Sequence, residues 1–386
     1  MIYAALPTGS YHGWGVCGKY IVKELSKMTE IRLITEGFDI NAIGDELDFR
    51  LLKETLVSDQ EFQMITSGHP LELDFPVLQA INNITGTPNF PNLRGLNNVG
   101  YTFFENNILS ASYIENSVRY FNTVVTGSTW CEEVLRSYGL HNVATIIQGI
   151  DPTIFNPFYN EKEYFQDQFV IFSGGKFELR KGQDVIIRAY KILQDRYRDT
   201  VLVNSWFNQW PASMHTMAAS PHIRFAPAAN DYVTMINQML CDNGIDITRV
   251  MTLPLYPNIM MPRLYKNTDI GIFPNRCEGG TNLVMMEYMA CAKPVIASYA
   301  SGHKDVLTDD NCLKLENLKP ITIANNDQNV ATWDEPDLEE IVAKLDWAYH
   351  HRDAIKRIGE CAGDELRKMT WQETGRRFYD ILGAGQ

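Results

Sequence analysis

Two glutamates and two adjacent glycines carry the most informative chemistry in this chain. They lie in DIGIFPNRCEGGTNLVMMEYMACAKPVIAS, residues 269–298, where Glu278 precedes Gly279 and Gly280, and eight residues separate Glu278 from Glu287. The backbone amides of residues 279–282 and the positive end of a following helix suit a diphosphate, and a carboxylate accepts hydrogen bonds from sugar hydroxyls. Taken alone, the segment is better explained by a plain turn followed by a solvated helix acid.

Two lysines lie close together in a second segment, FSGGKFELRKGQDVIIRAY, residues 172–190. A predicted strand ends at Ser173, Lys176 and Lys181 follow in the loop, and a helix is expected from near Gln183. Two ammonium groups at the carboxyl end of a strand suit the neutralisation of a diphosphate leaving group. A surface loop that is merely basic explains the same residues equally well.

Three glycines near the start of the chain match a nucleotide-binding pattern. In MIYAALPTGSYHGWGVCGKYIVKEL, Gly13, Gly15 and Gly18 have the G-x-G-x-x-G spacing of a dinucleotide-binding turn. A helix is expected to open at Gly18, and Glu36 stands about 20 residues on, as an NAD site requires. However, PTGSYH separates the apolar run Ile2–Leu6 from the first glycine, which is too long for the tight turn of such a site. The residues alone leave an NAD enzyme open.

These segments need a scaffold that brings their loops together. Short apolar runs alternate with helical patterns, which predicts an α/β fold, and the connection 151–168, rich in Pro, Asn and charge, divides ten predicted strands into two sets of five. The strands are Ile2–Leu6, Ile31–Thr35, Val99–Phe103, Thr123–Thr126, Ala144–Ile147, Phe169–Ser173, Thr200–Val203, Val250–Leu253, Ile270–Phe273 and Pro294–Ala297. Helices are expected over Ser128–Ser137, Gln183–Leu193, Met261–Lys266 and Leu283–Ala292, the last capped by Thr281 or Asn282. This pattern predicts two doubly wound parallel-sheet domains, with ligands bound in the cleft between them.

Composition limits the class of protein. The 386 residues are 45% hydrophobic, enough for a large core, and the formal net charge of −13 argues against nucleic acid as a partner. Seven single cysteines without a CxxC pair fit a reducing cytoplasm, which is the expected location. No run approaches about 18 consecutive apolar residues, so any membrane contact is expected to be peripheral. Because the chain lacks a HExxH-like histidine spacing and an Asp-x-Asp pair, no metal is predicted.

In their order along the chain, these segments resemble the GT-B glycosyltransferases, specifically the large retaining family 4 that uses nucleotide-sugar donors. The family's G-R/K-x4-K-G segment is matched by GKFELRKG, residues 175–182. Its E-x7-E motif, followed by a-M-A-x-x-x-P-V-I-a-S, is matched by Glu278, Glu287 and MACAKPVIAS. In the N-terminal half, TGSTWCEEVLRSYGL and IIQGIDPTIFNP are similar to family segments, and MTWQETGRRFYDIL resembles the last helix, which crosses back onto the N-terminal domain.

The resemblance implies domains and roles. It implies an acceptor-binding domain over residues 1–155, a nucleotide-sugar-binding domain over 156–368 and a crossing helix over 369–386. The catalytic groups are then Lys176 and Lys181, which hold the diphosphate, and Glu278, which positions the donor sugar. PTGSYHGWG matches the family's glycine-bearing cleft loop better than the NAD turn. The expected donor-binding residues are Gly13, Gly15, Gly175, Gly279, Gly280, Thr281, Asn282, Leu283 and Glu287, the last of which takes the ribose hydroxyls.

The chain departs from the family in three places. Its two acids are separated by eight residues and not seven, so Glu278 is expected to reach the donor sugar from a shifted position. The family's frequent histidine in the central N-terminal loop is missing, and YTFFENN puts Glu105 near that place. After strand Thr200–Val203, NSWFNQW replaces the usual glycine-rich end. We expect acceptor contacts from His12, Trp14 and Glu105.

The function implied by the resemblance is transfer of a hexose-type unit from a donor such as a UDP- or GDP-sugar to an acceptor hydroxyl, without cofactor or metal. Retention of the anomeric configuration is expected by a front-face route, because no acid stands in a matched motif at the anomeric position. Glycan, lipid-linked and small-molecule acceptors stay open. The alternatives are a nucleotide-sugar 2-epimerase of the same fold, an NAD-dependent oxidoreductase and a nucleotide-sugar-binding protein without activity.

Overall fold

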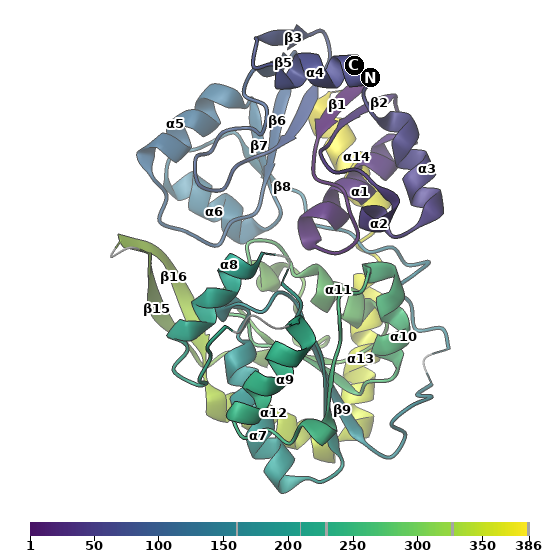
Figure 1. Cartoon of the computed structure of the whole chain (residues 1–386), viewed down its shortest axis with the longest axis vertical. Coiled ribbons are helices and arrows are strands. Elements are labelled where there is room, and N and C mark those ends of the chain that lie inside the picture. The colour runs from purple at the N-terminus through teal and green to yellow at the C-terminus, as the bar shows by residue number, and fades with distance from the viewer. Residues whose placement is uncertain (160, 209, 228–230, 326–327, 384–386) are drawn as a thin grey trace.

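Two sheets of parallel strands, one in each half of the molecule, form its centre (Figure 1). The computed structural model describes residues 1–159, 161–208, 210–227, 231–325 and 328–383. The N-terminal sheet has six strands in the order β2-β1-β4-β6-β7-β8. Their bounds are β1 Ile2–Ala5, β2 Ile31–Ile34, β4 Val77–Ala80, β6 Asn98–Thr102, β7 Thr123–Thr126 and β8 Val143–Thr145.

Helices cover both faces of this sheet, which is why strands such as IYAA in β1 are apolar and buried throughout. A small two-stranded sheet of β3 and β5 lies at the end of the N-terminal half that is drawn at the top of Figure 1. The bounds are α1 Gly13–Leu25, α2 Ile40–Ile43, α3 Glu46–Thr55, α4 Asp59–Thr66, β3 Leu71–Leu73, β5 Leu93–Gly95, α5 Ala111–Tyr120 and α6 Thr129–Ser137.

The C-terminal sheet also has six parallel strands, in the order β11-β10-β9-β12-β13-β14. Its strands are β9 Phe169–Gly174, β10 Thr200–Ser205, β11 Val250–Thr252, β12 Ile270–Phe273, β13 Val295–Ser298 and β14 Leu313–Leu315. Its helices are α7 Gln183–Arg196, α8 Pro211–Met214, α9 Tyr232–Asp242, α10 Met261–Lys266, α11 Leu283–Ala290, α12 Leu338–His350 and α13 Arg352–Leu366.

The fold class predicted from the sequence is confirmed, since both sheets are doubly wound and parallel. The prediction of five strands in each set is wrong, because it missed β4 and β14. In β4 a glutamine interrupts the apolar run: Gln79 is buried, and its amide exchanges hydrogen bonds of 3.3 and 3.1 Å with the backbone of Phe90. In β14, LKL, Lys314 occupies the middle of a three-residue edge strand. Polar residues therefore hid both strands from the apolar pattern.

The last helix, α14 (Trp371–Leu382), leaves the C-terminal half and packs on α1 of the N-terminal half. The rings of Tyr20 and Trp371 stack with centroids 5.1 Å apart, and Asn97 Nδ2 donates to the carbonyl of Ile381 at 3.0 Å. The amide of Ile150 donates to the carbonyl of Met369 at 2.7 Å, where the chain enters this helix. The chain thus passes between the two halves twice.

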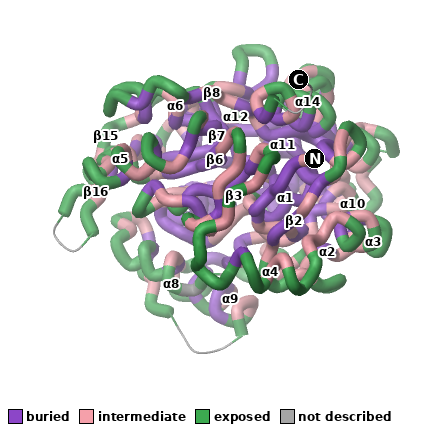
Figure 2. Tube along the Cα trace, turned by 90° about the horizontal axis from the view of Figure 1, so that it is seen from above, coloured by how far each residue is buried: buried purple, intermediate pink, exposed green. Residues whose placement is uncertain are grey.

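One hairpin was not predicted. Strands β15 (Leu318–Asn325) and β16 (Gln328–Pro336) are antiparallel and extend from the C-terminal half at the edge of the molecule (Figure 1). Buried positions elsewhere follow the inner strands and helix α1, with exposed positions on the outer turns (Figure 2). Among the described residues, no helix has the length and apolar character needed to cross a bilayer.

Candidate functional site

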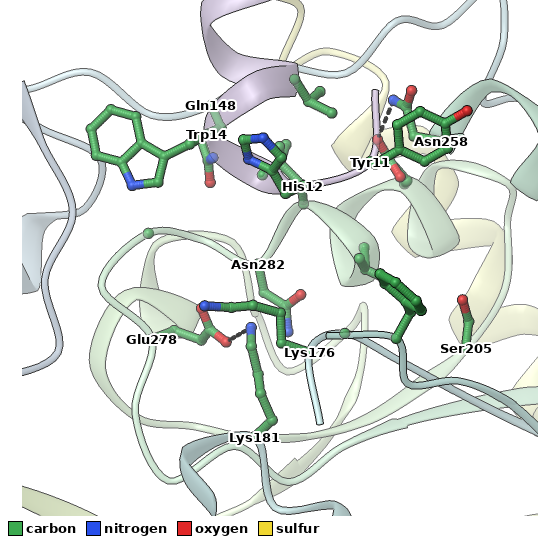
Figure 3. Close-up of a pocket in the computed structure, with 18 of the residues that line it drawn as sticks. Tyr11, His12, Trp14, Gln148, Lys176, Lys181, Ser205, Asn258, Glu278 and Asn282 are labelled. Atoms are coloured by element: carbon green, nitrogen blue, oxygen red, sulfur yellow. Dashed lines mark hydrogen bonds and ion pairs between the residues drawn. The ribbon is translucent and has the colours of Figure 1, made fainter. Parts of the chain in front are cut away.

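A cleft lies where the carboxyl ends of the two sheets face each other, and its volume is about 290 Å³ (Figure 3). In the C-terminal sheet β9 and β12 are neighbours, and the chain order runs outward from them in opposite directions. The loops that follow such a pair diverge to opposite faces of the sheet and leave a crevice between them. Here these are the β9 loop, residues 175–182, and the β12 loop, residues 274–282. They carry the predicted lysines and Glu278.

Glu278 is the electrostatic centre of the cleft. Its side chain is 6% exposed, and its Oε1 accepts hydrogen bonds from Lys181, from Arg180 at 3.1 Å and from Asn275. Burial alone raises the pKa of this carboxyl, but the Lys181 ammonium and the Arg180 guanidinium outweigh burial and lower the pKa to about 2. Glu278 is therefore ionised throughout the physiological range.

The two predicted lysines lie in different surroundings. Lys181 is buried, which lowers the pKa of its ammonium even though Glu278 opposes this shift, and it bonds directly to Glu278. Lys176 is more accessible: its Nζ lies 3.4 Å from Glu178 Oε1 and 5.1 Å from the centroid of the Trp210 ring. Figure 3 shows the Lys176 side chain extending into the cleft. Lys176 is thus the cation most open to an anionic ligand, and Lys181 holds the carboxylate.

Helix α11 begins at this cleft with its N-cap at Asn282, one of the two residues predicted to cap it. The Asn282 side chain accepts a hydrogen bond from Met285 N at 3.4 Å and donates to His303 Nε2 at 3.2 Å. His303 Nδ1 in turn donates to the carbonyl of Ser298 at 3.0 Å. Burial lowers the pKa of His303 to about 4, so the neutral ring fixes the amide of Asn282. Sequence reasoning missed His303, which lies outside the motifs.

Of the residues from Glu278 to the start of α11, some line the cleft and others contact the N-terminal half. Gly280, Asn282 and Leu283 line the cleft, as does Gly175 in the β9 loop. Gly279 instead faces the N-terminal half, where a Cβ would lie 2.4 Å from the carbonyl oxygen of Phe104, so only glycine fits. Thr281 is also turned away, and its amide and hydroxyl donate to Gln148 Oε1 at 3.3 and 3.1 Å.

Glu287 lines the cleft from the first turns of α11 and is 4% exposed. Its Oε1 accepts a hydrogen bond from Asn258 Nδ2 at 3.1 Å, and burial raises its pKa to about 8. Asn258 N donates to the carbonyl of Ser10 at 2.9 Å, and Lys19 Nζ donates to the hydroxyl of Ser10 at 2.9 Å. A hydrogen-bonded chain therefore joins Glu287 to helix α1 in the other half.

The glycine-rich start of the chain is not a dinucleotide-binding turn. Helix α1 was expected to open at Gly18 but begins at Gly13, and His12 caps it by accepting from Gly15 N at 3.0 Å through Nδ1. A Cβ on Gly18 would lie 2.0 Å from the carbonyl oxygen of Pro7, so this glycine permits close packing of the helix on the preceding loop. Gly13 lines the cleft, whereas Gly15 is buried against Gly9.

The three predicted acceptor residues all line the cleft but differ in their contacts. The His12 ring meets the edge of Trp210 from the opposite half, with centroids 5.1 Å apart. Trp14 packs edge-on against Tyr101 and Phe103, as a core residue does. The Glu105 carboxylate lies 3.3 Å from Arg180 Nη1.

Sequence reasoning missed two cleft residues of note, Gln148 and Arg180. Gln148 stands in IIQGIDPTIFNP next to the matched glycine, so its place in the motif could have found it. Arg180 lies within GKFELRKG at a position that the motif leaves free. Trp210, in the departing segment NSWFNQW, also lines the cleft, although packing under a loop is what the sequence favours for the aromatic residues of this segment over an acceptor platform. No group of three or more metal-binding side chains occurs among the described residues.

Two doubly wound sheets with a charged cleft between their carboxyl ends define the GT-B fold, so the resemblance seen in the sequence is confirmed at this level. Residues 238–331 match the family model described as glycosyl transferases group 1. Sulfoquinovosyl transferase SQD2 of Arabidopsis thaliana is 27% identical over 112 residues, which cover 29% of this chain and 19% of that protein. The chain therefore matches about a fifth of that curated relative.

Solved structures are similar over the whole chain. Sucrose-phosphate synthase from Thermosynechococcus elongatus has a TM-score of 0.68 at 14% identity, with 100% of this chain and 99% of that chain covered. HepE from Anabaena, in complex with UDP and glucose, has a TM-score of 0.68 at 15% identity, with 99% of each chain covered. At such identities the likeness establishes the fold.

Proposed function

We propose that this protein is a glycosyltransferase that moves a sugar from a nucleoside diphosphate sugar to an acceptor hydroxyl. One observation carries the proposal: Lys176, Lys181 and the N-terminus of α11 converge in one cleft with the carboxylates of Glu278 and Glu287. Cations and a helix N-terminus suit a diphosphate, and carboxylates suit sugar hydroxyls. The glycosyl transferases group 1 match and the UDP and UDP-glucose complexes of HepE support this assignment.

Each cleft group has a role in the proposed reaction. Lys176, with its accessible ammonium, binds the diphosphate, and the phosphates compete with Glu278 for Lys181. Glu278 Oε2 accepts from a hydroxyl of the donor sugar, since the three protein donors converge on Oε1. Glu287 takes the ribose hydroxyls. With its pKa raised to about 8, it is largely protonated at pH 7 and is able to donate as well as accept.

We further propose that the transfer retains the anomeric configuration and needs no metal. A double displacement requires a carboxylate free to attack the anomeric carbon. Glu278 is held by two cations and Glu105 by Arg180, so neither is an uncommitted nucleophile. The β-phosphate of the donor then takes the proton from the acceptor hydroxyl as the glycosidic bond breaks. Lys176 and Lys181 with the α11 N-terminus supply the positive charge that a metal would otherwise provide.

Incubation with UDP-, GDP- and ADP-sugars and a panel of glycan, lipid-linked and small-molecule acceptors tests the proposal. We expect donor consumption that depends on an acceptor, persists in EDTA and is lost in Glu278→Gln. Proton NMR of the first product should show the donor's anomeric configuration preserved. Consumption without an acceptor, with a changed sugar, identifies a 2-epimerase. Binding of nucleotide sugars without turnover identifies a binding protein, and an inverted anomer removes the front-face route.

A further inference from the structure

The β15–β16 hairpin reaches from the C-terminal half onto the segment 105–108 of the N-terminal half. Trp333 Nε1 donates to the carbonyl oxygen of Glu105 at 2.8 Å. One residue earlier, Thr332 N donates to Asn107 Oδ1 at 2.8 Å, and its carbonyl accepts from Asn107 Nδ2 at 3.4 Å. The backbone that carries Glu105 is therefore held by hydrogen bonds from the opposite half.

An apolar contact accompanies these hydrogen bonds. Trp333, Ala331 and Cys277 are buried together, and Trp130 of helix α6 packs against them from the N-terminal half. Trp333 is 8% exposed, so its indole is nearly removed from water. Burial of an aromatic ring of this size contributes substantially to an interface. The hairpin thus buries apolar side chains against the N-terminal half in addition to forming hydrogen bonds with it.

The base of the hairpin is fixed to the loops of the cleft. Asp334 N donates to the carbonyl of Arg276 at 3.0 Å, and Arg276 forms ion pairs with Glu335 and with Asp184 of α7. Arg276 is fully buried, and its own amide donates to the carbonyl of Arg180 at 2.7 Å. The base of the hairpin is therefore connected by hydrogen bonds and ion pairs to both the β12 loop and the β9 loop.

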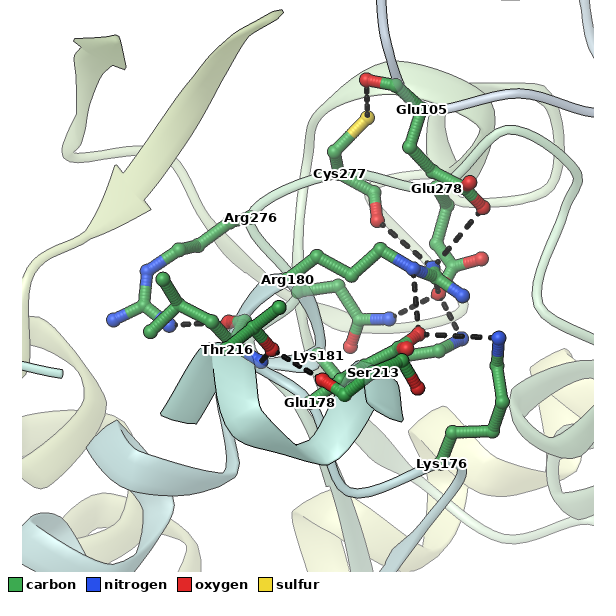
Figure 4. Close-up of polar contacts among 12 residues, drawn as sticks. Glu105, Lys176, Glu178, Arg180, Lys181, Ser213, Thr216, Arg276, Cys277 and Glu278 are labelled. Atoms are coloured by element: carbon green, nitrogen blue, oxygen red, sulfur yellow. Dashed lines mark hydrogen bonds and ion pairs between the residues drawn. The ribbon is translucent and has the colours of Figure 1, made fainter. Parts of the chain in front are cut away.

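Glu105 connects the hairpin to the proposed catalytic carboxylate (Figure 4). Its carboxylate lies 3.3 Å from Arg180 Nη1, and the same nitrogen lies 3.1 Å from Glu278 Oε1. Arg180 Nε also pairs with Glu178 at 2.7 Å. The Arg180 guanidinium thus contacts the carboxylates of Glu105, Glu178 and Glu278. The strength of its interaction with Glu278 depends on where Glu105 is held.

We propose that the β15–β16 hairpin is an interdomain clasp and that Trp333 is a positioning residue, which holds Glu105 against Arg180 and so sets the charge around Glu278. Neither Trp333 nor any other described residue of the hairpin lines the cleft. The clasp itself does not depend on what the cleft binds, whereas its effect on sugar transfer rests on the function proposed above.

Hydrogen exchange of interdomain amides tests the clasp directly. The amide of Ile108 donates to the carbonyl of Val330 at 3.1 Å, so it is protected only while the hairpin is seated. In Trp333→Phe, which keeps an aromatic ring but removes the N–H donor, we expect ~2- to 10-fold faster exchange at Ile108. Asn107→Ala should have the same effect. The control Trp347→Phe, on the surface of α12, should leave exchange unchanged. Equal exchange in all variants overturns the clasp.

A double-mutant cycle tests the positioning role. Trp333→Phe should lower kcat by ~3- to 10-fold and leave the Kd for UDP within about twofold, because the lysines and the α11 N-terminus are unchanged. In a Glu105→Gln background the same substitution should have little further effect on kcat. Additive effects overturn the route through Glu105. If the wild-type protein transfers no sugar, the proposed function fails, while the exchange result still decides the clasp.

Discussion

Lys181 has two partners in the proposed reaction, the Glu278 carboxylate in the structure and the diphosphate of a donor. A charge-assisted hydrogen bond contributes about 1.5–3 kcal/mol, so Lys181→Ala should weaken UDP binding on the order of ten- to a hundredfold. The same substitution removes a charge that lowers the pKa of Glu278. Isothermal titration with UDP measures the effect. Lys191→Ala, on the surface of α7 beside Asp195, serves as the control, and equal affinities in both variants contradict the assignment.

We expect Glu287 to make the stability of the protein depend on pH. Burial raises its pKa from 4.5 to about 8, so the folded state holds this proton more tightly than the unfolded state. Its contribution to the free energy of unfolding is then complete below pH 4.5 and declines as the pH rises to about 8, by up to ~1.4 kcal/mol per pH unit.

Denaturant unfolding at several pH values between 6 and 8 measures this dependence. We expect the wild type to lose stability relative to Glu287→Gln as the pH rises, because the amide cannot ionise. Glu339→Gln, at an exposed position of α12, should run parallel to the wild type. Parallel curves for Glu287→Gln and the wild type would mean that Glu287 does not hold a proton in the folded state.

At the level of residues, the motifs contain the charged side chains on the C-terminal side of the cleft, but they do not show which residues these side chains contact. Glu278, Lys176 and Lys181 stand at matched positions, and all three line the cleft. The pairing of Lys181 with Glu278 joins two loops far apart in the sequence, so no local pattern contains it. Arg180, which bridges Glu105 and Glu278, is similarly defined only by the packing of both halves.

Helix α1 depends on Gly18 for its close packing on the preceding loop, but not on Gly13. Gly18→Ala places a methyl group against the Pro7 carbonyl and should cost about 1–3 kcal/mol or more, as overpacking does. Gly13→Ala should change stability by less than about 0.5 kcal/mol, because nothing lies within 4 Å of its Cβ position. Thermal melting of both variants distinguishes the two positions. In a dinucleotide-binding turn the first glycine would also be intolerant, because it forms the tight turn.

Elements with continuous apolar runs were predictable, and elements built from mixed residues were not. The predicted bounds of Thr123–Thr126 and Ile270–Phe273 coincide with β7 and β12. The hairpin was not predicted for two reasons. All residues of β15 are partly or fully exposed, and the hairpin packs on the N-terminal half through β16. Helix α1 opened earlier than expected because His12 caps it, a role that Ser, Thr, Asp or Asn usually signal.

At the scale of the whole molecule, helix α14 packs on the N-terminal half although it follows the C-terminal half in the sequence. Trp371 is 4% exposed and stacked on Tyr20 of α1, so Trp371→Ala should destabilise the protein by about 3–5 kcal/mol. Arg376→Ala, on the exposed face of the same helix, should cost less than about 1 kcal/mol. Hydrogen exchange should locate the Trp371→Ala effect in α1. Selective loosening of the C-terminal sheet would contradict this packing.

The return of α14 also has a consequence for biosynthesis. The last strand of the N-terminal sheet ends at Thr145, but the surface of α1 around Tyr20 stays uncovered until residues 371–382 have been made. At about 5–20 residues per second, this interval lasts on the order of 10–50 s on the ribosome. The half that is translated first is therefore finished by a segment translated after the other half. During that interval the apolar surface that Trp371 later covers is exposed to solvent.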